Sequence, residues 1–210
     1  ARLQQQLGSR PRWLAASTHP GEERLVAAAQ RALAAKRPGL LAILVPRHPQ
    51  RGAALASSLS GEGFAVALRS RGEAPAPESE VYIADTIGEL GLWYRLAPVA
   101  FVGGSLVPHG GQNPLEAAKL GSAVVTGPHT ENFARIAGEM ERAGALIRVA
   151  DAAALGEAVA RLLDDEAVRE RQVAAAADYA RHEALVLERI SAAIEPLLAK
   201  ARKAGPAGGN

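Results

Sequence analysis

Cysteine is absent from the 210-residue sequence, which excludes disulfide bonds, thiolate metal ligands and a cysteine nucleophile. Aromatic residues account for only 4% of the chain, too few for a protein that binds single-stranded nucleic acid by stacking bases on exposed rings. No run of about 18 apolar residues occurs, so the sequence predicts no membrane-spanning helix. Its first residues lack both an initiator methionine and the charged-then-apolar pattern of a secretory signal. We therefore expect a soluble, globular piece of a longer protein.

A strong excess of one charge is also missing. The chain has 24 Lys and Arg against 22 Asp and Glu, a formal net charge of +2. The basic residues are scattered, whereas a nucleic-acid-binding protein concentrates them on one face, so we predict no nucleic-acid partner. Hydrophobic residues make up 48% of the chain, and residues 10–200 contain no internal repeat or low-complexity linker. The sequence therefore predicts one large domain.

Short, apolar runs alternate with longer Ala- and Leu-rich amphipathic runs. The short runs predict strands at Trp13–Ser17, Leu41–Pro46, Phe64–Leu68, Val81–Ala84, Val99–Val102, Ala123–Thr126 and Ala145–Val149. Helices are expected at 21–36, 50–60, 89–95, from Asn113 onward, and at 152–163, 166–180 and 184–200. Strands separated by helices form parallel sheets through right-handed crossovers. We predict an α/β fold: a parallel sheet of about six strands, helices on both faces and a helical C-terminal extension.

Polar residues collect where the predicted strands end. These segments are Ser17–Glu22, Pro46–Pro49, Asp85–Glu89, Gly103–Ser105 with Pro108–Asn113, and Gly127–Glu131. Four of the five histidines lie in them, and segments at the opposite edge, such as Ala35–Gly39, carry no such groups. Open parallel sheets bind ligands beyond the carboxyl ends of their strands, so this asymmetry predicts a binding site there.

The segment from Gly103 to Glu116 is the most informative of these. Asn113 suits a helix N-cap, Pro114 the first helical position and Glu116 the third, which together form a capping box. If this pattern stood alone, helix capping without any ligand would be the favoured explanation. A Gly-rich loop, His109–Gly111, precedes this one, and helix N-termini attract anions, so we favour phosphate binding.

Two other segments carry candidate functional residues. Thr86 and Glu89 form a second capping-box pattern, for which a purely structural role is favoured. Arg47 directly follows an apolar strand and lies between Pro46 and Pro49. Packing explains an arginine at this position poorly, so we expect it to bind an anion. His48 and His109 could be catalytic. The favoured interpretation is that each ring is neutral and forms hydrogen bonds with the loop backbone.

Several familiar chemistries lack their motifs. No G-x-G-x-x-G follows the first strand, and no P-loop, H-E-x-x-H or G-x-S-x-G sequence occurs. His and carboxylate residues show no metal-ligand spacing, so we predict no metal site. Phosphate recognition by a helix N-terminus and an arginine remains.

Taken together, the motifs resemble those of the bacterial 3-deoxy-D-manno-octulosonic acid (Kdo) transferase family, in its C-terminal half. The resemblance rests on Ala16–Glu23, Val45–Pro49, Asp85–Gly91, Phe101–Leu106, Gly110–Glu116 and Gly127–Thr130, which occur in the family's order between Arg12 and His182. Ile87, Ala117 and Glu131 depart from the residues usual in that family, and none of these departures alters a proposed ligand.

The resemblance implies one half of a GT-B glycosyltransferase, a Rossmann-like domain that binds the donor CMP-Kdo. By motif, CMP would be held by Pro46, Arg47, Ile87, Gly88, Glu89, Asn113, Pro114, Leu115 and Glu116. A second group of donor-site candidates is Ser17, Thr18, His19, His48, Gly103, Ser105, Gly110 and Gly111. The resemblance further implies that Arg47 offsets negative charge, Gly88 and Glu89 meet the cytosine edge, and Glu116 accepts from ribose hydroxyls. No cofactor besides the donor is expected.

The same resemblance implies how the chain is divided. Residues 1–11 would be the remnant of a linker, 12–182 the nucleotide-sugar-binding domain, 183–203 a helix packing toward a missing N-terminal domain, and 204–210 a disordered tail. The missing half would hold the general base and the lipid A precursor, at the cytoplasmic face of the inner membrane. This chain alone would then bind CMP and transfer nothing.

Two alternatives remain open from the sequence. One is a UDP-sugar-dependent GT-B transferase or epimerase domain. The other is a non-catalytic nucleotide-binding or regulatory module of the same fold.

Overall fold

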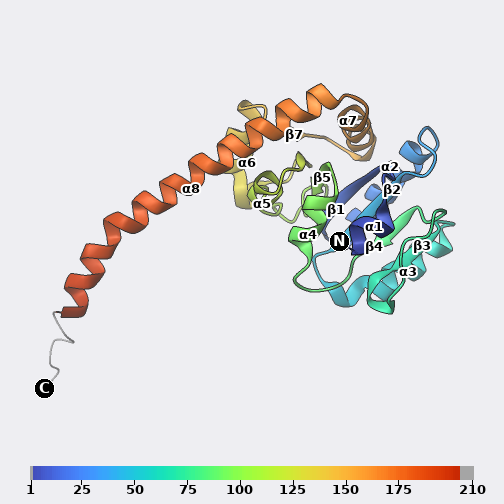
Figure 1. Cartoon of the computed structure of the whole chain (residues 1–210), viewed down its shortest axis with the longest axis horizontal. Helices are drawn as coiled ribbons and strands as arrows, with labels where there is room; N and C mark the ends of the chain where they lie inside the picture. Colours follow the sequence, from blue (N-terminus) through green and yellow to red (C-terminus); the bar gives the residue numbers. More distant parts are fainter. Residues whose placement is uncertain (1, 204–210) are drawn as a thin grey trace, which may run out of the picture.

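The computed structural model describes residues 2–203, which contain one seven-stranded, all-parallel sheet (Figure 1). The strand order is β3-β4-β2-β1-β5-β6-β7. The strands are β1 Arg12–Thr18, β2 Leu41–Pro46, β3 Val66–Leu68, β4 Val81–Ile83, β5 Val99–Val102, β6 Ala123–Thr126 and β7 Leu146–Arg148. The predicted parallel sheet is confirmed, with seven strands where about six were expected.

Alternate residues of the central strands pack into two separate cores, one on each face of the sheet. Trp13 and Ala15 of β1 face the first core, and Leu14 and Ala16 face the second. Because both faces are covered, β2, β5 and β6 are buried along their whole length. This explains why these strands appear in the sequence as continuous apolar runs.

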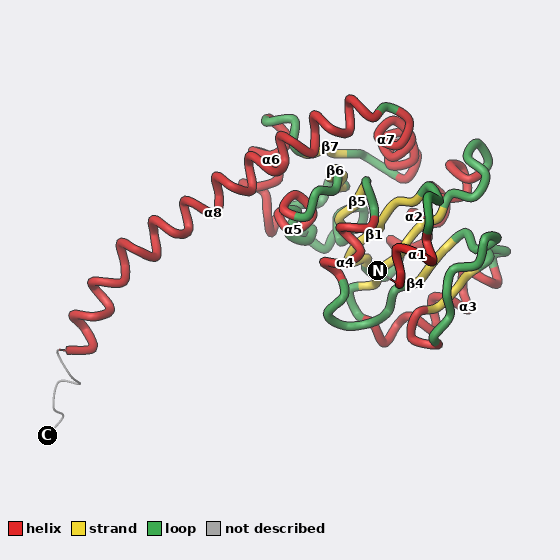
Figure 2. The backbone as a smooth tube through the Cα atoms, in the orientation of Figure 1, coloured by secondary structure: helices red, strands yellow, loops and turns green. Residues whose placement is uncertain are grey.

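Helices cover the two faces of the sheet (Figure 2). On one face lie α2 Glu22–Ala34, α3 Gly52–Gly61 and α7 Ala152–Asp164. On the other lie α1 Arg2–Leu7, α4 Leu90–Leu96, α5 Leu115–Lys119, α6 Ala134–Arg142 and the first part of α8 Glu166–Lys203. Short 3-10 turns, η1 Pro49–Arg51, η2 Arg69–Arg71 and η3 Glu131–Phe133, follow β2, β3 and β6.

Three helical regions differ from expectation. Helices α1 and α6 were not predicted, and Leu7 of α1 is buried in the second core although residues 1–11 were expected to be a linker remnant. The two helices expected at 166–180 and 184–200 form the single helix α8. The segment Ala180–Glu183 contains neither Gly nor Pro, so nothing in it interrupts the helix.

Helix α8 packs on the sheet only at its start. Ala176 and Ala180 are buried in the second core, and the helix then runs on away from the body of the domain (Figures 1 and 2). The predicted disordered tail, 204–210, lies outside the described residues.

Candidate functional site

The strand order places the ends of β1 and β5 side by side at the centre of the sheet. From β1 the chain continues to β2 on one side, and β5 later pairs with β1 on the other. Open α/β sheets bind ligands at the carboxyl ends of the strands where the order reverses in this way, and we call this region the strand-end crevice. Ser17 adopts a left-handed backbone there, with φ 55°, where the register of β1 shifts. Strain of this kind in a non-glycine residue is typical of functional sites.

Three histidines and an arginine converge on this crevice. His19, after β1, stacks on His109, after β5, with ring centroids 4.3 Å apart, and meets His48, after β2, edge-on at 6.2 Å. The pKa of His19 lies below its ordinary value, first because of burial and then because of His109, His48 and Arg47. Burial is the larger cause; the smaller one, the charge of the neighbouring groups, is the part that a bound anion would offset.

A buried carboxylate joins the loops after β1 and β5. Glu22, at the start of α2, is fully buried and accepts hydrogen bonds from the backbone N–H groups of Gly104, Ser105 and Leu106 at 2.7–2.9 Å. The N–H of His19 donates to the same carboxylate at 3.2 Å. Glu22 therefore fixes the two loops that carry His19 and His109.

A second carboxylate, Glu23, holds the neighbouring side of the site. It is buried and accepts two hydrogen bonds from Arg51, at 2.6 and 3.2 Å. The hydroxyl of Thr18, also buried, donates to it at 3.3 Å. Thr18 therefore braces the end of β1 from within.

The glycine-rich loop after β5 is bound tightly to its surroundings. Ser105 is fully buried, and its hydroxyl donates to Val102 O and accepts from Gly127 N. Gly111, with φ 75°, packs so closely that a Cβ would lie 2.9 Å from His129 O. Gly103 is equally crowded, because a Cβ there would lie 2.7 Å from Glu22. These residues shape the loop through close backbone packing.

The segment Asn113–Glu116 follows the loop after β5 and leads into α5. Asn113 is exposed, and its side-chain oxygen accepts from Leu115 N, two residues along the chain, at 3.0 Å. The predicted capping box requires Glu116 N to donate to this oxygen and the Glu116 carboxylate to accept from Asn113 N. Neither bond forms within residues 2–203, and the N-cap position of α5 is Pro114, so the predicted capping box is wrong. The Glu116 carboxylate is exposed, and α5 is only five residues long. A helix this short contributes less to anion binding than the histidine and arginine groups do.

In the loop after β4, Thr86 and Glu89 do not form the helix cap that their spacing predicted. Arg69 donates from two nitrogens to both oxygens of Glu89, and the Thr86 hydroxyl donates to the same carboxylate. Thr86 therefore does not cap α4, which begins only at Leu90. The pKa of Glu89 is lowered, mainly by the hydrogen bond from Arg69.

Two residues of this loop remain accessible. The side chain of Ile87 is 88% exposed, and Gly88 is exposed with φ 83°. Strand β4 lies two strands from β1, about 10 Å across the sheet. The exposed loop and the cationic cluster are therefore separate parts of one edge.

The structure thus groups the predicted residues by their accessibility. Exposed or partly exposed at the strand ends are Ser17, His19, Arg47, His48, Ile87, Gly88, Glu89, Asn113, Leu115 and Glu116. Buried beneath them are Thr18, Pro46, Gly103, Ser105, Gly110, Gly111 and Pro114. The first group is accessible along the strand-end edge, and the second lies beneath it and supports its backbone.

Sequence reasoning missed four residues that organise this edge: Glu22, Glu23, Arg69 and Gln112. The Gln112 amide lies 3.1 Å from Nε2 of His19. Glu22 and Gln112 lie within polar segments named from the sequence, and Glu22 and Glu23 within the motif Ala16–Glu23, but none of them was singled out as a site residue. Acidic residues in the first turn of a helix are common because the helix dipole favours them. A weak signal was available for Arg69, which directly follows the apolar end of β3 as Arg47 follows β2.

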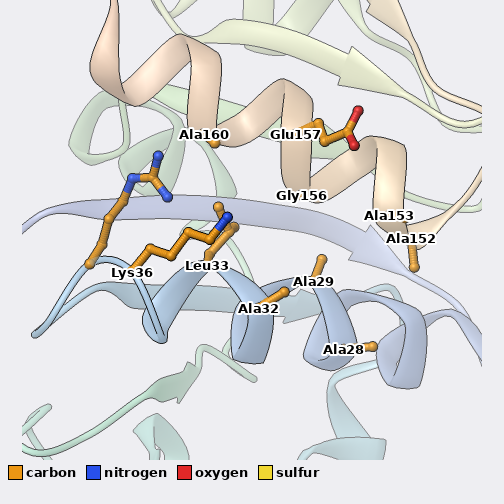
Figure 3. A pocket seen from close by; sticks show the side chains of 11 residues that line it. Ala28, Ala29, Ala32, Leu33, Lys36, Ala152, Ala153, Gly156, Glu157 and Ala160 are labelled. Carbon is orange, nitrogen blue, oxygen red and sulfur yellow. The ribbon is translucent and has the colours of Figure 1, made fainter.

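A different hollow, of about 550 Å³, lies between α2 and α7 (Figure 3). Most of its lining is alanine, including Ala29, Ala32 and Ala160, and charge is supplied only by Lys36, Arg37 and Glu157. Convergent polar side chains distinguish ligand sites from apolar gaps, so the crevice at the strand ends is the better candidate.

Two further properties bear on function. In the described part of the chain, no cluster of three or more His, Cys, Asp or Glu side chains has an arrangement suited to a metal ion. None of the helices between residues 2 and 203 combines the length and apolar character needed to cross a membrane.

Comparison with known proteins gives consistent relatives, although no family model matches the chain. A 3-deoxy-D-manno-octulosonic acid transferase from Haemophilus influenzae is 45% identical over 163 residues, covering 77% of this chain and 38% of the relative. One from Bordetella pertussis is 42% identical, covering 80% and 40%. The chain therefore spans about two fifths of the length of these relatives.

Among solved structures, the chain is similar to the C-terminal CMP-Kdo binding domain of WaaA from Acinetobacter baumannii. The two are 35% identical with a TM-score of 0.81, over 85% of this chain and 94% of the other. The similarity thus covers a whole domain of known structure.

Proposed function

Because the chain belongs to the 3-deoxy-D-manno-octulosonic acid transferase family, we propose that it is the domain that binds the donor CMP-Kdo. The observation that carries the proposal is the group of Arg47, His19, His48 and His109 at the strand ends, in a chain that matches 94% of a CMP-Kdo binding domain. The donor carries a phosphate and a carboxylate, which are the anions that arginine and histidine bind.

Three parts of the strand-end edge would then contact different parts of the donor. Arg47 and the histidines face the anionic groups. Ile87 and Gly88 present backbone and an exposed side chain to the base. Glu116 has an exposed carboxylate, a ready acceptor for ribose hydroxyls. Asn113, Pro114 and Leu115 set the start of α5 beside them.

Transfer would proceed by attack of an acceptor hydroxyl on the anomeric carbon of Kdo. The bond from that carbon to the phosphate oxygen breaks, and CMP leaves with the electron pair. Arg47 and the histidines would stabilise the charge that develops on the departing phosphate. We place the base that removes the hydroxyl proton in the remaining three fifths of the intact protein.

The rest of the intact enzyme would supply the acceptor side. We propose that it binds a lipid A precursor at the cytoplasmic face of the inner membrane. Residues 183–203 of α8, which extend beyond the body of the domain, would pack against it (Figure 1). No cofactor other than the donor is included in this proposal.

Isothermal titration with CMP and UMP tests the proposed ligand. We expect CMP to bind and UMP to bind more weakly, because the cytosine amino group is a donor that uracil lacks. Arg47→Ala should weaken CMP binding, whereas Arg161→Ala, an exposed arginine on α7, should not. Preference for UMP would favour a UDP-sugar enzyme, and no nucleotide binding would contradict the proposal.

A transfer assay separates this domain from the intact enzyme. The 210-residue chain should form no product from CMP-Kdo and a lipid A precursor, while the full-length protein should. Transfer by the chain alone would disprove the assignment of the base to the missing part. A full-length protein that binds CMP and transfers nothing would instead identify a non-catalytic module.

A further inference from the structure

Three consecutive N–H groups after β5 form an anion-binding concavity, and the protein itself fills it. Gly104, with φ 67°, Ser105 and Leu106 turn their N–H groups toward one point, the geometry that binds phosphate in many α/β proteins. In this chain that point is occupied by the carboxylate of Glu22, 0% exposed. A nucleotide phosphate therefore cannot take the position that the backbone would otherwise offer.

We propose that Glu22 is a positioning residue that acts as an internal substitute for a ligand anion. Its carboxylate preorganises the loops after β1 and β5 and leaves the cationic crevice as the place for the donor's charge. The inference rests on the proposed function only where it concerns CMP; the closure of the concavity stands on the geometry alone.

The hydrogen bonds account for this role. An ionised carboxylate is an acceptor-only group, and four N–H donors meet the two oxygens of Glu22. Three of the donors come from the loop after β5, more than 80 residues away in sequence, and the fourth belongs to His19. Removing the carboxylate would leave several buried N–H groups without an acceptor, which is strongly unfavourable.

The surroundings leave room for the Glu22 side chain and connect it to the crevice. Gly103 leaves room for it, since a Cβ there would lie 2.7 Å from Oε2 of Glu22. Gln112 N–H donates to Gly103 O and its amide lies beside His19, so the bonded loops are linked directly to the crevice. A shift of the loop would therefore move both stacked histidines.

Chemical rescue tests the proposal with the 210-residue chain. Glu22→Ala removes the acceptor of four N–H groups, so CMP affinity should fall by about tenfold or more. The part removed has the size of acetate, so added acetate should restore the affinity. Pivalate at equal ionic strength, too bulky for the cavity, should not restore it. In Arg47→Ala, which leaves no cavity of this kind, acetate should have no effect. Wild-type affinity in Glu22→Ala, or loss that acetate does not reverse in a folded variant, would overturn the proposal.

A second readout does not depend on CMP. In amide NMR spectra, the signals of Gly104, Ser105 and Leu106 should shift in Glu22→Ala and return toward their wild-type positions with acetate. If the wild-type chain bound no CMP but these signals responded in this way, the proposed function would fail and the role of Glu22 would stand. Amide signals indifferent to acetate would refute the role of Glu22.

A second variant covers the case in which Glu22→Ala does not fold. Glu22→Gln keeps the volume but directs an amide NH₂ toward backbone N–H donors. It should bind CMP more weakly than the wild type and should not respond to acetate, because no cavity is present. Unchanged CMP affinity in Glu22→Gln would contradict a requirement for the carboxylate.

Discussion

The imidazole rings of His19 and His109 lie stacked, with centroids 4.3 Å apart, although the residues follow strands far apart in the sequence. Arg47 and His48 add to the positive potential, and Glu23 is the carboxylate that opposes it at His19. Burial first, and then the charges around the ring, hold the pKa of His19 below its ordinary value, and a bound anion would offset the second cause. Ligand binding and proton uptake should be coupled in this crevice.

The first prediction concerns stability and pH without ligand. The folded pKa of His19 lies below its ordinary value of 6.5, so well above pH 6.5 the ring is neutral in both the folded and the unfolded state. As the pH falls from there through the folded pKa, the unfolded chain takes up the proton first, and the folded state loses stability. Urea unfolding should show a smaller loss for His19→Gln than for the wild type. His182→Gln, at an exposed position on α8, should behave as the wild type.

The second prediction concerns proton uptake on binding. An anion beside His19 should raise its pKa, so CMP binding should take up protons near pH 6 to 7. Titration calorimetry in buffers of different ionisation enthalpy measures that uptake, and comparison with His19→Gln removes the contribution of CMP itself. Equal uptake by both proteins would contradict a role for His19.

The third prediction concerns Glu89. Because Arg69 lowers its pKa, the ion pair stabilises the fold above the ordinary carboxyl pKa of 4.5 and is lost as pH falls through the folded value. Glu89→Gln should cost about 1 kcal/mol of unfolding free energy at pH 7. The difference should disappear below the folded pKa. Glu157→Gln, an exposed site, should show no such dependence in the same urea series.

The fourth prediction separates crowded from open glycines. Gly103→Ala would place a methyl 2.7 Å from Glu22 and 2.9 Å from the carbonyl oxygens of Ala16 and Ser17. Overpacking of this kind costs about 1–3 kcal/mol. Gly61→Ala meets no atom within 4 Å and ends α3, so it should be neutral or slightly stabilising. Thermal unfolding of the two variants makes the comparison, and equal melting temperatures would contradict the close packing.

The fifth prediction concerns Glu116. Its carboxylate is exposed and receives no hydrogen bond within the described residues, so Glu116→Gln should change the unfolding free energy by less than about 0.5 kcal/mol. The same variant should bind CMP more weakly by titration calorimetry, because a charged acceptor for ribose hydroxyls is lost. A variant with full affinity would remove Glu116 from the proposed site.

The sheet was predictable because burial on both faces leaves a direct mark in the sequence. Leu41–Pro46 and Val99–Val102 are apolar runs and coincide with β2 and β5. Helix α6 was missed although its nine residues are amphipathic, with Ala137 and Met140 buried and charged residues on the other face. Ends of elements shifted by a residue or two, as at α4 and α5.

The site was predictable in position but not in its internal bonding. The polar segments after the strands did meet at one edge, because parallel strands end together. Local patterns misread Thr86 and Glu89, since a capping box is defined within four residues and Arg69 lies 20 positions away in sequence. Glu22 was missed for the same reason: its donors Gly104, Ser105 and Leu106 belong to a distant strand end.

The strand order also determines when this crevice can exist during synthesis. Leu14 of β1 pairs with Ala100 of β5, so β1 lacks its second neighbour until a strand much later in the sequence has been made. Contacts of such long sequence separation form slowly. A ribosome-bound chain that has not yet released Val99–Leu106 would hold His19 without His109 and Glu22 without three of its donors. Such nascent chains should capture no nucleotide.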